Sequence, residues 1–132
     1  MKRNISIVVT MALFMPLSVY SASQSAISAL KYASAEINKQ IPKLIDSETE
    51  LFSTFAHGDT LTYFNRLINV KKSELDISHF RKTMIKQLSN NFCTNPDGKY
   101  FRDNDLKWKH IYNDKNDISI TNITTSVSSC SK

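Results

Sequence analysis

The feature that most constrains the fold is a pair of cysteines, the only two in a chain of 132 residues. Cys93 directly follows an apolar helical pattern, and Cys130 lies two residues before the end of the sequence. A disulfide between them would fasten the tail of the chain to the end of that helix. Two free buried thiols or an intermolecular bridge are the alternatives. The compartment decides among these, because structural disulfides persist in oxidising surroundings.

The N-terminal segment predicts export. A basic dipeptide precedes a largely apolar run over 5–19, and Val19 and Ser21 supply small residues at positions −3 and −1 of a signal-peptidase site. The apolar run is shorter than the roughly 20 residues of a bilayer span, so a stable membrane anchor is the weaker interpretation. We therefore expect a signal peptide at 1–21 and a single domain over 22–132 that is periplasmic or secreted.

An oxidising destination favours an intramolecular disulfide between Cys93 and Cys130. On a chain-entropy estimate, closing a loop of this size stabilises a fold by about 4 kcal/mol. Small domains have a net stability of roughly 5–15 kcal/mol, so the bridge would be a large share of the total. We expect its role to be structural.

The charge balance argues against nucleic acid as a partner. The chain has 17 Lys and Arg and 12 Asp and Glu, and residues 1–21 hold two of the basic residues and no acid. The exported domain is thus left with 15 basic and 12 acidic residues, a net charge of +3. Nucleic-acid-binding domains usually carry a dense basic stripe, whereas these charges are mixed along the chain.

The hydrophobic pattern predicts an α+β domain with the element order α-β-β-α-β-β. Helical periods of three and four mark two helices, and period-two alternation with turn residues marks two hairpins. We expect the four strands to form one antiparallel sheet with both helices packed on its apolar face. The expected elements are a helix over 25–41, a hairpin over 51–70, a helix over 77–92, and strands over 106–112 and 118–127.

The second helix and the loop after it have the clearest local signals. Asp76 precedes the apolar series and is a suitable N-cap, because its carboxylate can accept from free amides of the first turn. The run over 94–98, Thr-Asn-Pro-Asp-Gly, carries strong turn chemistry and predicts a loop. Tyr100 and Phe101 would then lie in that loop, and Cys93 at the end of the helix.

The sequence contains no convincing catalytic, metal-binding or cofactor-binding constellation. None of the three histidines, His57, His79 and His110, has the spacing of a zinc motif, and both glycines fall in predicted turns. His110 alternates with bulky residues, which favours a satisfied, partly buried side chain over a ligand or a base. We expect a protein that is not an enzyme and binds no metal or cofactor.

Three carboxylates spaced by two, Asp46, Glu48 and Glu50, would share one face of an extended segment. Such an array can bind a cation or act as paired acid and base, but it is more often a charged edge that discourages strand pairing. If the protein were a small hydrolase or a metal-dependent enzyme, Asp46, Glu48 and His110 would be the candidates for its site.

Aromatic residues in the C-terminal third are the candidate partner-binding site. Partner surfaces are enriched in aromatic side chains, and those considered are Tyr100, Phe101, Trp108 and Tyr112. The alternative is that Trp108 and the phenylalanines fill the core. Tyr100 and Phe101, in the predicted loop, would be the exposed members.

The run over 38–51, Asn-Lys-Gln-Ile-Pro-Lys-Leu-Ile-Asp-Ser-Glu-Thr-Glu-Leu, resembles a pattern in small exported proteobacterial proteins, the quorum-sensing-regulated virulence factor family. The later matches are Tyr63, Cys93, Tyr112, Ile120 and Cys130. The segments 102–104 and 113–117 depart from that pattern, which has a leucine-rich segment and a glycine there. The resemblance implies an exported α+β domain associated with virulence or the envelope, and it carries over no catalytic residue.

These observations lead to one main hypothesis and one alternative. The main hypothesis is a soluble exported accessory protein that binds another protein of the cell envelope or a secreted target, in a virulence or secretion system. The alternative is a periplasmic immunity protein or inhibitor that occupies the active site of a toxin or hydrolase.

Overall fold

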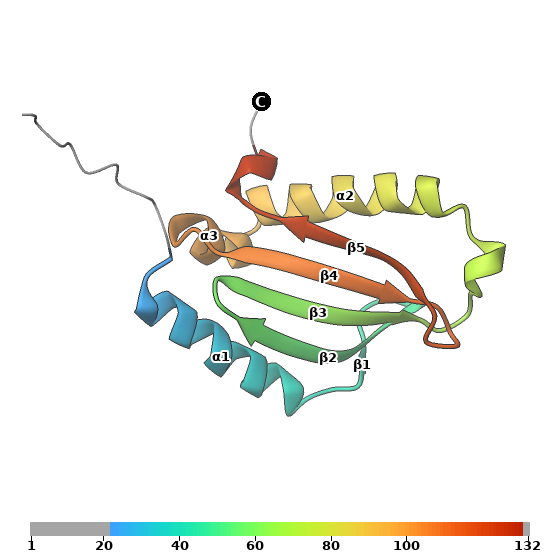
Figure 1. Ribbon diagram of the computed structural model, residues 1–132, viewed down its shortest axis with the longest axis horizontal. Helices are drawn as coiled ribbons and strands as arrows, with labels where there is room; N and C mark the ends of the chain where they lie inside the picture. Colours follow the sequence, from blue (N-terminus) through green and yellow to red (C-terminus); the bar gives the residue numbers. More distant parts are fainter. Residues whose placement is uncertain (1–21, 131–132) are drawn as a thin grey trace, which may run out of the picture.

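The computed structural model describes residues 22–130, which form a five-stranded sheet and three α-helices (Figure 1). The expected signal peptide lies outside the described residues. The strands are β1 (Lys43–Leu44), β2 (Thr49–His57), β3 (Thr60–Leu67), β4 (Lys107–Asn113) and β5 (Ser119–Thr125). The helices are α1 (Gln24–Asn38), α2 (Ile77–Thr94) and α3 (Pro96–Asp103), with short 3-10 turns η1 (Lys72–Glu74) and η2 (Val127–Cys130).

The sheet is mixed, which corrects the expected four antiparallel strands. Its order follows the chain, β1-β2-β3-β4-β5, and the β3–β4 pair is parallel whereas the other pairs are antiparallel. The reason is the connection between the two hairpins. Helix α2 returns the chain along the length of the sheet, so that β4 begins beside the start of β3 and Thr60 pairs with Lys107. The additional strand β1 has only two residues, too few to show a periodic pattern.

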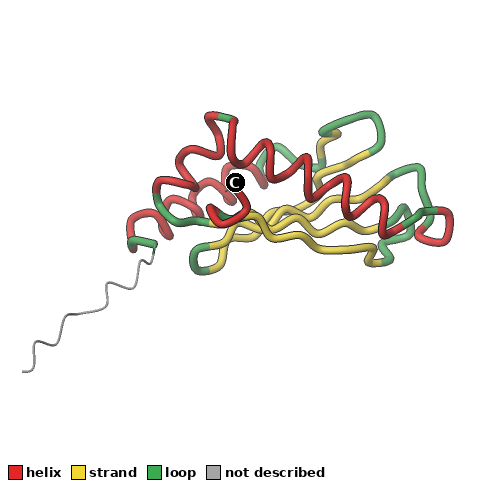
Figure 2. The backbone as a smooth tube through the Cα atoms, turned by 90° about the horizontal axis from the view of Figure 1, so that it is seen from above, coloured by secondary structure: helices red, strands yellow, loops and turns green. Residues whose placement is uncertain are grey.

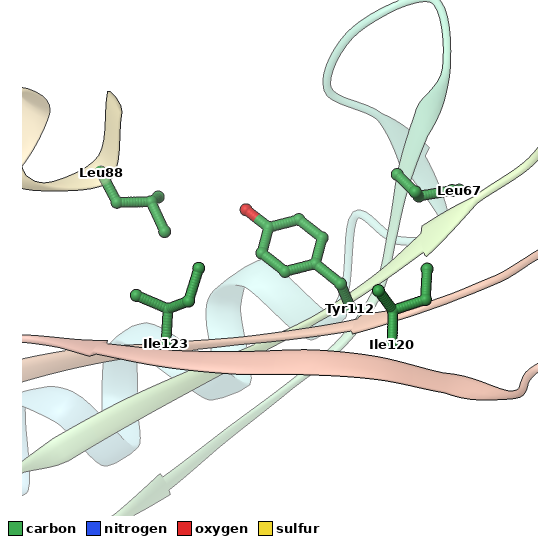
Figure 3. Close-up of a cluster of buried hydrophobic side chains, with 5 residues drawn as sticks. All are labelled: Leu67, Leu88, Tyr112, Ile120 and Ile123. Atoms are coloured by element: carbon green, nitrogen blue, oxygen red, sulfur yellow. The ribbon is translucent and has the colours of Figure 1, made fainter. Parts of the chain in front are cut away.

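The helices cover one face of the sheet, as the sequence predicts (Figure 2). Two groups of buried side chains fill the space between them. Leu67, Tyr112 and Ile123 project from three neighbouring strands toward Leu88 of α2 (Figure 3). Under α1, a second group is built on Ala26, Leu30, Leu61 and Leu106. The opposite face of the sheet carries no helix from residues 22–130.

Helix α1 ends before the predicted boundary. Ser23 caps its start, with the hydroxyl accepting from the Ala26 N–H at 3.2 Å. The helix ends at Asn38 rather than at Ile41, and the Ile41–Pro42 peptide bond is cis. The chain then enters the short edge strand β1.

Helix α2 follows the prediction, and α3 replaces the predicted loop. Asp76 caps α2 by accepting from the His79 N–H at 3.0 Å. The turn residues after Cys93 instead begin a new helix, because Pro96 occupies a first-turn position where its missing N–H costs nothing. Tyr100 and Phe101 therefore lie on a helix rather than in a loop.

The Cys93–Cys130 disulfide is present, with a Cα–Cα distance of 5.3 Å. It joins the last turn of α2 to η2 and so fixes the end of the described chain against that helix (Figure 1). Within residues 22–130, no helix has the length and apolar character needed to cross a membrane.

Candidate functional site

A groove runs along α2 on the helix-covered face of the sheet. Helix α1 packs mainly against β2, and α2 packs against β5, so part of the central strands lies between them. One hollow of about 310 Å³ lies over this part, and a second of about 360 Å³ shares Phe80 and Met84 with it. We refer to these two contiguous hollows as the α2 groove.

The floor and walls of the α2 groove come from distant parts of the chain. Strands supply the floor, with Leu67 from β3 and Trp108, His110 and Tyr112 from β4. Helix α2 supplies one wall with Phe80, Met84, Gln87, Leu88 and Asn91. The segment before β2 and the first residue of that strand form the opposite rim with Ile45, Asp46, Glu48 and Thr49. Asn95 and Asp97 lie past the end of α2.

His110 is held in the floor by a ring on the neighbouring strand. Its imidazole stacks on Tyr63, with ring centroids 4.7 Å apart and an interplanar angle of 10°. The amide nitrogen of Asn65 lies 3.4 Å from His110 Nδ1 and also near the Tyr63 carbonyl, at 3.3 Å. Because an amide NH₂ only donates, a hydrogen bond between these two atoms runs from Asn65 Nδ2 to His110 Nδ1. Burial lowers the pKa of His110 to about 4, so the ring is uncharged at neutral pH.

Two tyrosines beside His110 are also protonated at neutral pH. Burial raises the pKa of Tyr63 to about 12, with a further contribution from the negative charge of Asp97. Burial and the nearby charge of Asp46 raise the pKa of Tyr112 above its usual range. The groove thus presents the neutral phenol of Tyr112 and the neutral imidazole of His110 close to the carboxylates of Asp46 and Asp97.

Two buried polar atoms in the floor or next to it have no hydrogen-bond partner among the described residues. The indole Nε1 of Trp108, a residue that is 9 % exposed, is a donor without an acceptor. The amide Oδ1 of Asn65 is an acceptor without a donor, in a residue 1 % exposed. Unpaired buried polar groups are costly, so each of these atoms would gain from a ligand or water that pairs with it.

The structure separates the four aromatic candidates. Trp108 and Tyr112 line the α2 groove. Phe101 packs in the interior instead, with its ring centroid 5.4 Å from that of Trp108 and 6.4 Å from that of Phe92. Tyr100 is 46 % exposed on α3 and lies outside the groove. Their roles in partner binding stay predictions.

The carboxylates expected to share one face do not form an array. Asp46 and Glu48 lie on the rim of the groove before β2 begins, and Asp46 Oδ1 accepts from the Glu48 N–H at 2.8 Å. Glu50 is in β2 and pairs with Arg66 at 2.8 Å. Within residues 22–130, no group of His, Cys, Asp and Glu side chains is arranged to hold a metal ion.

Sequence reasoning missed the wall of the groove. It placed the apolar face of α2 in the core, and Leu88 is indeed buried, but Phe80 and Met84 are only partly covered and line the groove. Gln87 and Asn91 extend the same wall with neutral amides. The signal was present in the mixed apolar and amide character of this face, but nothing in the pattern shows how much of it the sheet leaves uncovered.

The sequence matches no protein-family model and no curated protein. Solved structures do share the fold. A candidate secreted protein of Pseudomonas aeruginosa superposes with a TM-score of 0.69 at 13 % identity, covering 84 % of this chain and 100 % of the other. The type 2 secretion system pilotin of Vibrio vulnificus gives 0.67 at 7 % identity, covering 82 % and 94 %. That of Vibrio cholerae gives 0.62 at 11 %, covering 80 % and 93 %.

At these identities the likeness is one of fold. The chain shares its α+β architecture with proteobacterial proteins described as secreted or as parts of secretion systems. This supports the expectation from the sequence that it resembles small exported proteobacterial proteins. The quorum-sensing-regulated virulence factor family is not confirmed by these matches.

Proposed function

We propose that this protein is an exported accessory protein of the bacterial envelope that binds a segment of a partner protein in the α2 groove. The observation that carries the proposal is the groove itself. It has an aromatic and aliphatic floor and wall, including Trp108, Tyr112 and Met84, with neutral amides along one side. Apolar pockets with a few placed polar groups are the usual form of a binding site.

The setting supports the same proposal. The disulfide suits an oxidising compartment, as does the export signal expected at 1–21. Two of the proteins that share the fold are pilotins of type 2 secretion systems. An accessory role in an envelope assembly is therefore the function that we infer, and the proposed action is binding rather than catalysis.

Site-specific photocrosslinking in the living cell tests this proposal. A photoreactive residue replaces Gln87, which is exposed on the groove wall, and in a matched strain it replaces Tyr32, which is 70 % exposed on α1. We expect one discrete adduct from position 87 and none from position 32. The same adduct should disappear when Met84→Arg is added, with the fold checked by circular dichroism.

A second measurement closes the test. The partner identified from the adduct is purified and titrated against the wild type and the Met84→Arg variant. Binding by the wild type, with at least a tenfold loss in the variant, supports the proposal. Equal adducts from both positions, or equal affinities of the two proteins, would refute it.

A further inference from the structure

The α2 groove is acidic in a protein whose exported part is basic. Asp46 and Glu48 lie on its rim and Asp97 at its far end, and no Lys or Arg of the described residues lines either hollow. His110 in the floor is uncharged at neutral pH. The domain as a whole has a net charge of +3, so this concentration of negative charge is local.

The acidic groups lie at opposite ends of the groove. Asp46 is beside the N-terminal half of α2, where it lines the hollow that contains Phe80 and Met84. Asp97 lies just past the C-terminal end of α2, beside Asn95. The wall between them runs from Phe80 to Asn91, which is about three helical turns, or roughly 16 Å at 1.5 Å per residue.

The indole ring of Trp108 forms part of the floor between these ends. The Nε1 of Trp108 is buried and unpartnered among the described residues, and the same ring lines the groove. A polypeptide in the groove brings backbone carbonyl and N–H groups, and the neutral amides of Gln87 and Asn91 can pair with them.

From this arrangement we propose that the occupant is a short amphipathic segment with apolar side chains facing the floor and Lys or Arg at both ends. The inference rests on the proposed function, since it names the chemistry of the partner for that same groove. The apolar stretch covers the wall from Phe80 to Asn91, and the terminal cations lie near Asp46 and Asp97. Charge complementarity of this kind orients a partner and rejects segments with acidic ends.

Two synthetic peptides test the inference on the purified exported protein. Both are capped at each terminus and have leucines at i, i+4 and i+7, and they differ only in carrying Lys or Glu at both ends. Trp108 is the only tryptophan of the chain, so its fluorescence reports occupation of the groove directly. The isosteric variants are Asp46→Asn and Asp97→Asn, and the matched control is Glu36→Gln, on α1 outside the groove.

We expect the Lys peptide to bind more tightly than the Glu peptide and to lose about three- to fivefold in affinity in each Asn variant, with little change in Glu36→Gln. The difference between the peptides should shrink as salt is added. If both peptides bind equally well and the Asn variants have no effect, this inference is overturned while the proposed function stands. If neither peptide changes the fluorescence or binds by calorimetry, the proposed function fails as well.

Discussion

The side chain of Asn38 takes the place of a neighbouring strand at Thr54. Asn38 Oδ1 accepts from the Thr54 N–H at 2.9 Å, and Asn38 Nδ2 donates to the Thr54 carbonyl at 3.0 Å. Strand β1 pairs only with Glu50 and Leu51, so the rest of β2 would otherwise expose backbone groups at the sheet edge. Exposed edges invite pairing with another chain, and Asn38 blocks this one from α1.

Replacement of Asn38 by Ala should therefore both destabilise the protein and promote its self-association. We expect a loss of about 1–3 kcal/mol in the free energy of unfolding, because two backbone groups of Thr54 lose their partner, while its hydroxyl keeps its contacts with Ser34. Urea unfolding and light scattering of concentrated samples measure the two effects. Gln40→Ala, in the exposed segment after α1, should change neither quantity.

Gly98 is required by a close backbone approach, since a Cβ there would lie 2.1 Å from the carbonyl oxygen of Phe92. We expect Gly98→Ala to push α3 away from the end of α2 and to cost about 1–3 kcal/mol in unfolding free energy. Gly58 supplies the matched comparison, because its φ is +54° and nothing lies within 4 Å of the Cβ position. Gly58→Asn should be tolerated, since Asn adopts positive φ more readily than other residues. Equal losses in the two variants would contradict this account.

The elements that the sequence predicted well are those whose signal is local. The N-cap Asp76, the hairpin of β2 and β3 around Gly58, and the face of α2 that buries Leu88 all depend on neighbours within a few residues. The disulfide was predictable for a different reason, because two cysteines in a chain that is expected to be exported leave few alternatives.

The features that were missed depend on contacts between distant segments. Pro96 and Gly98 are turn residues in isolation, yet Pro96 fits the first turn of α3 and Gly98 allows that helix to approach Phe92. The parallel pairing of β3 and β4 follows from the path of α2 over the sheet, which no pattern within either strand specifies. The groove could be predicted only in part, since Trp108 and Tyr112 stood out but the gap between α1 and α2 did not.

Loss of the disulfide should lower the free energy of unfolding without unfolding the protein. For the loop from Cys93 to Cys130, the chain-entropy estimate is about 4 kcal/mol, and the Cys93→Ser/Cys130→Ser double variant should lose an amount in that range. Urea unfolding of the wild type with and without a reductant provides a second measure. The reductant should have no effect on the double variant, and thiol titration of the unreduced, denatured wild type should find no free thiol.

His110 should make the protein less stable as the pH falls from neutral. Its pKa is lowered to about 4 in the folded state by burial, whereas the ordinary value is 6.5, so the unfolded chain takes up a proton that the folded protein resists. Above pH 6.5 the ring is neutral in both the folded and the unfolded state, so His110 does not lower the free energy of unfolding. Between pH 6.5 and pH 4 the unfolded chain is protonated first, and the free energy of unfolding falls progressively. From the linkage relation, the loss is about 2–3 kcal/mol in unfolding free energy.

Unfolding curves between pH 7.5 and pH 4 for three proteins would isolate this contribution from that of the carboxylates, which all three share. His110→Phe removes the titration while keeping an aromatic ring against Tyr63, so its stability should fall less steeply over this interval than that of the wild type. His79→Gln, at an exposed position in the first turn of α2, should follow the wild type. If His110→Phe keeps the full pH dependence, the folded protein binds the His110 proton as readily as the unfolded chain does, and burial of the ring is not what makes this fold sensitive to acid.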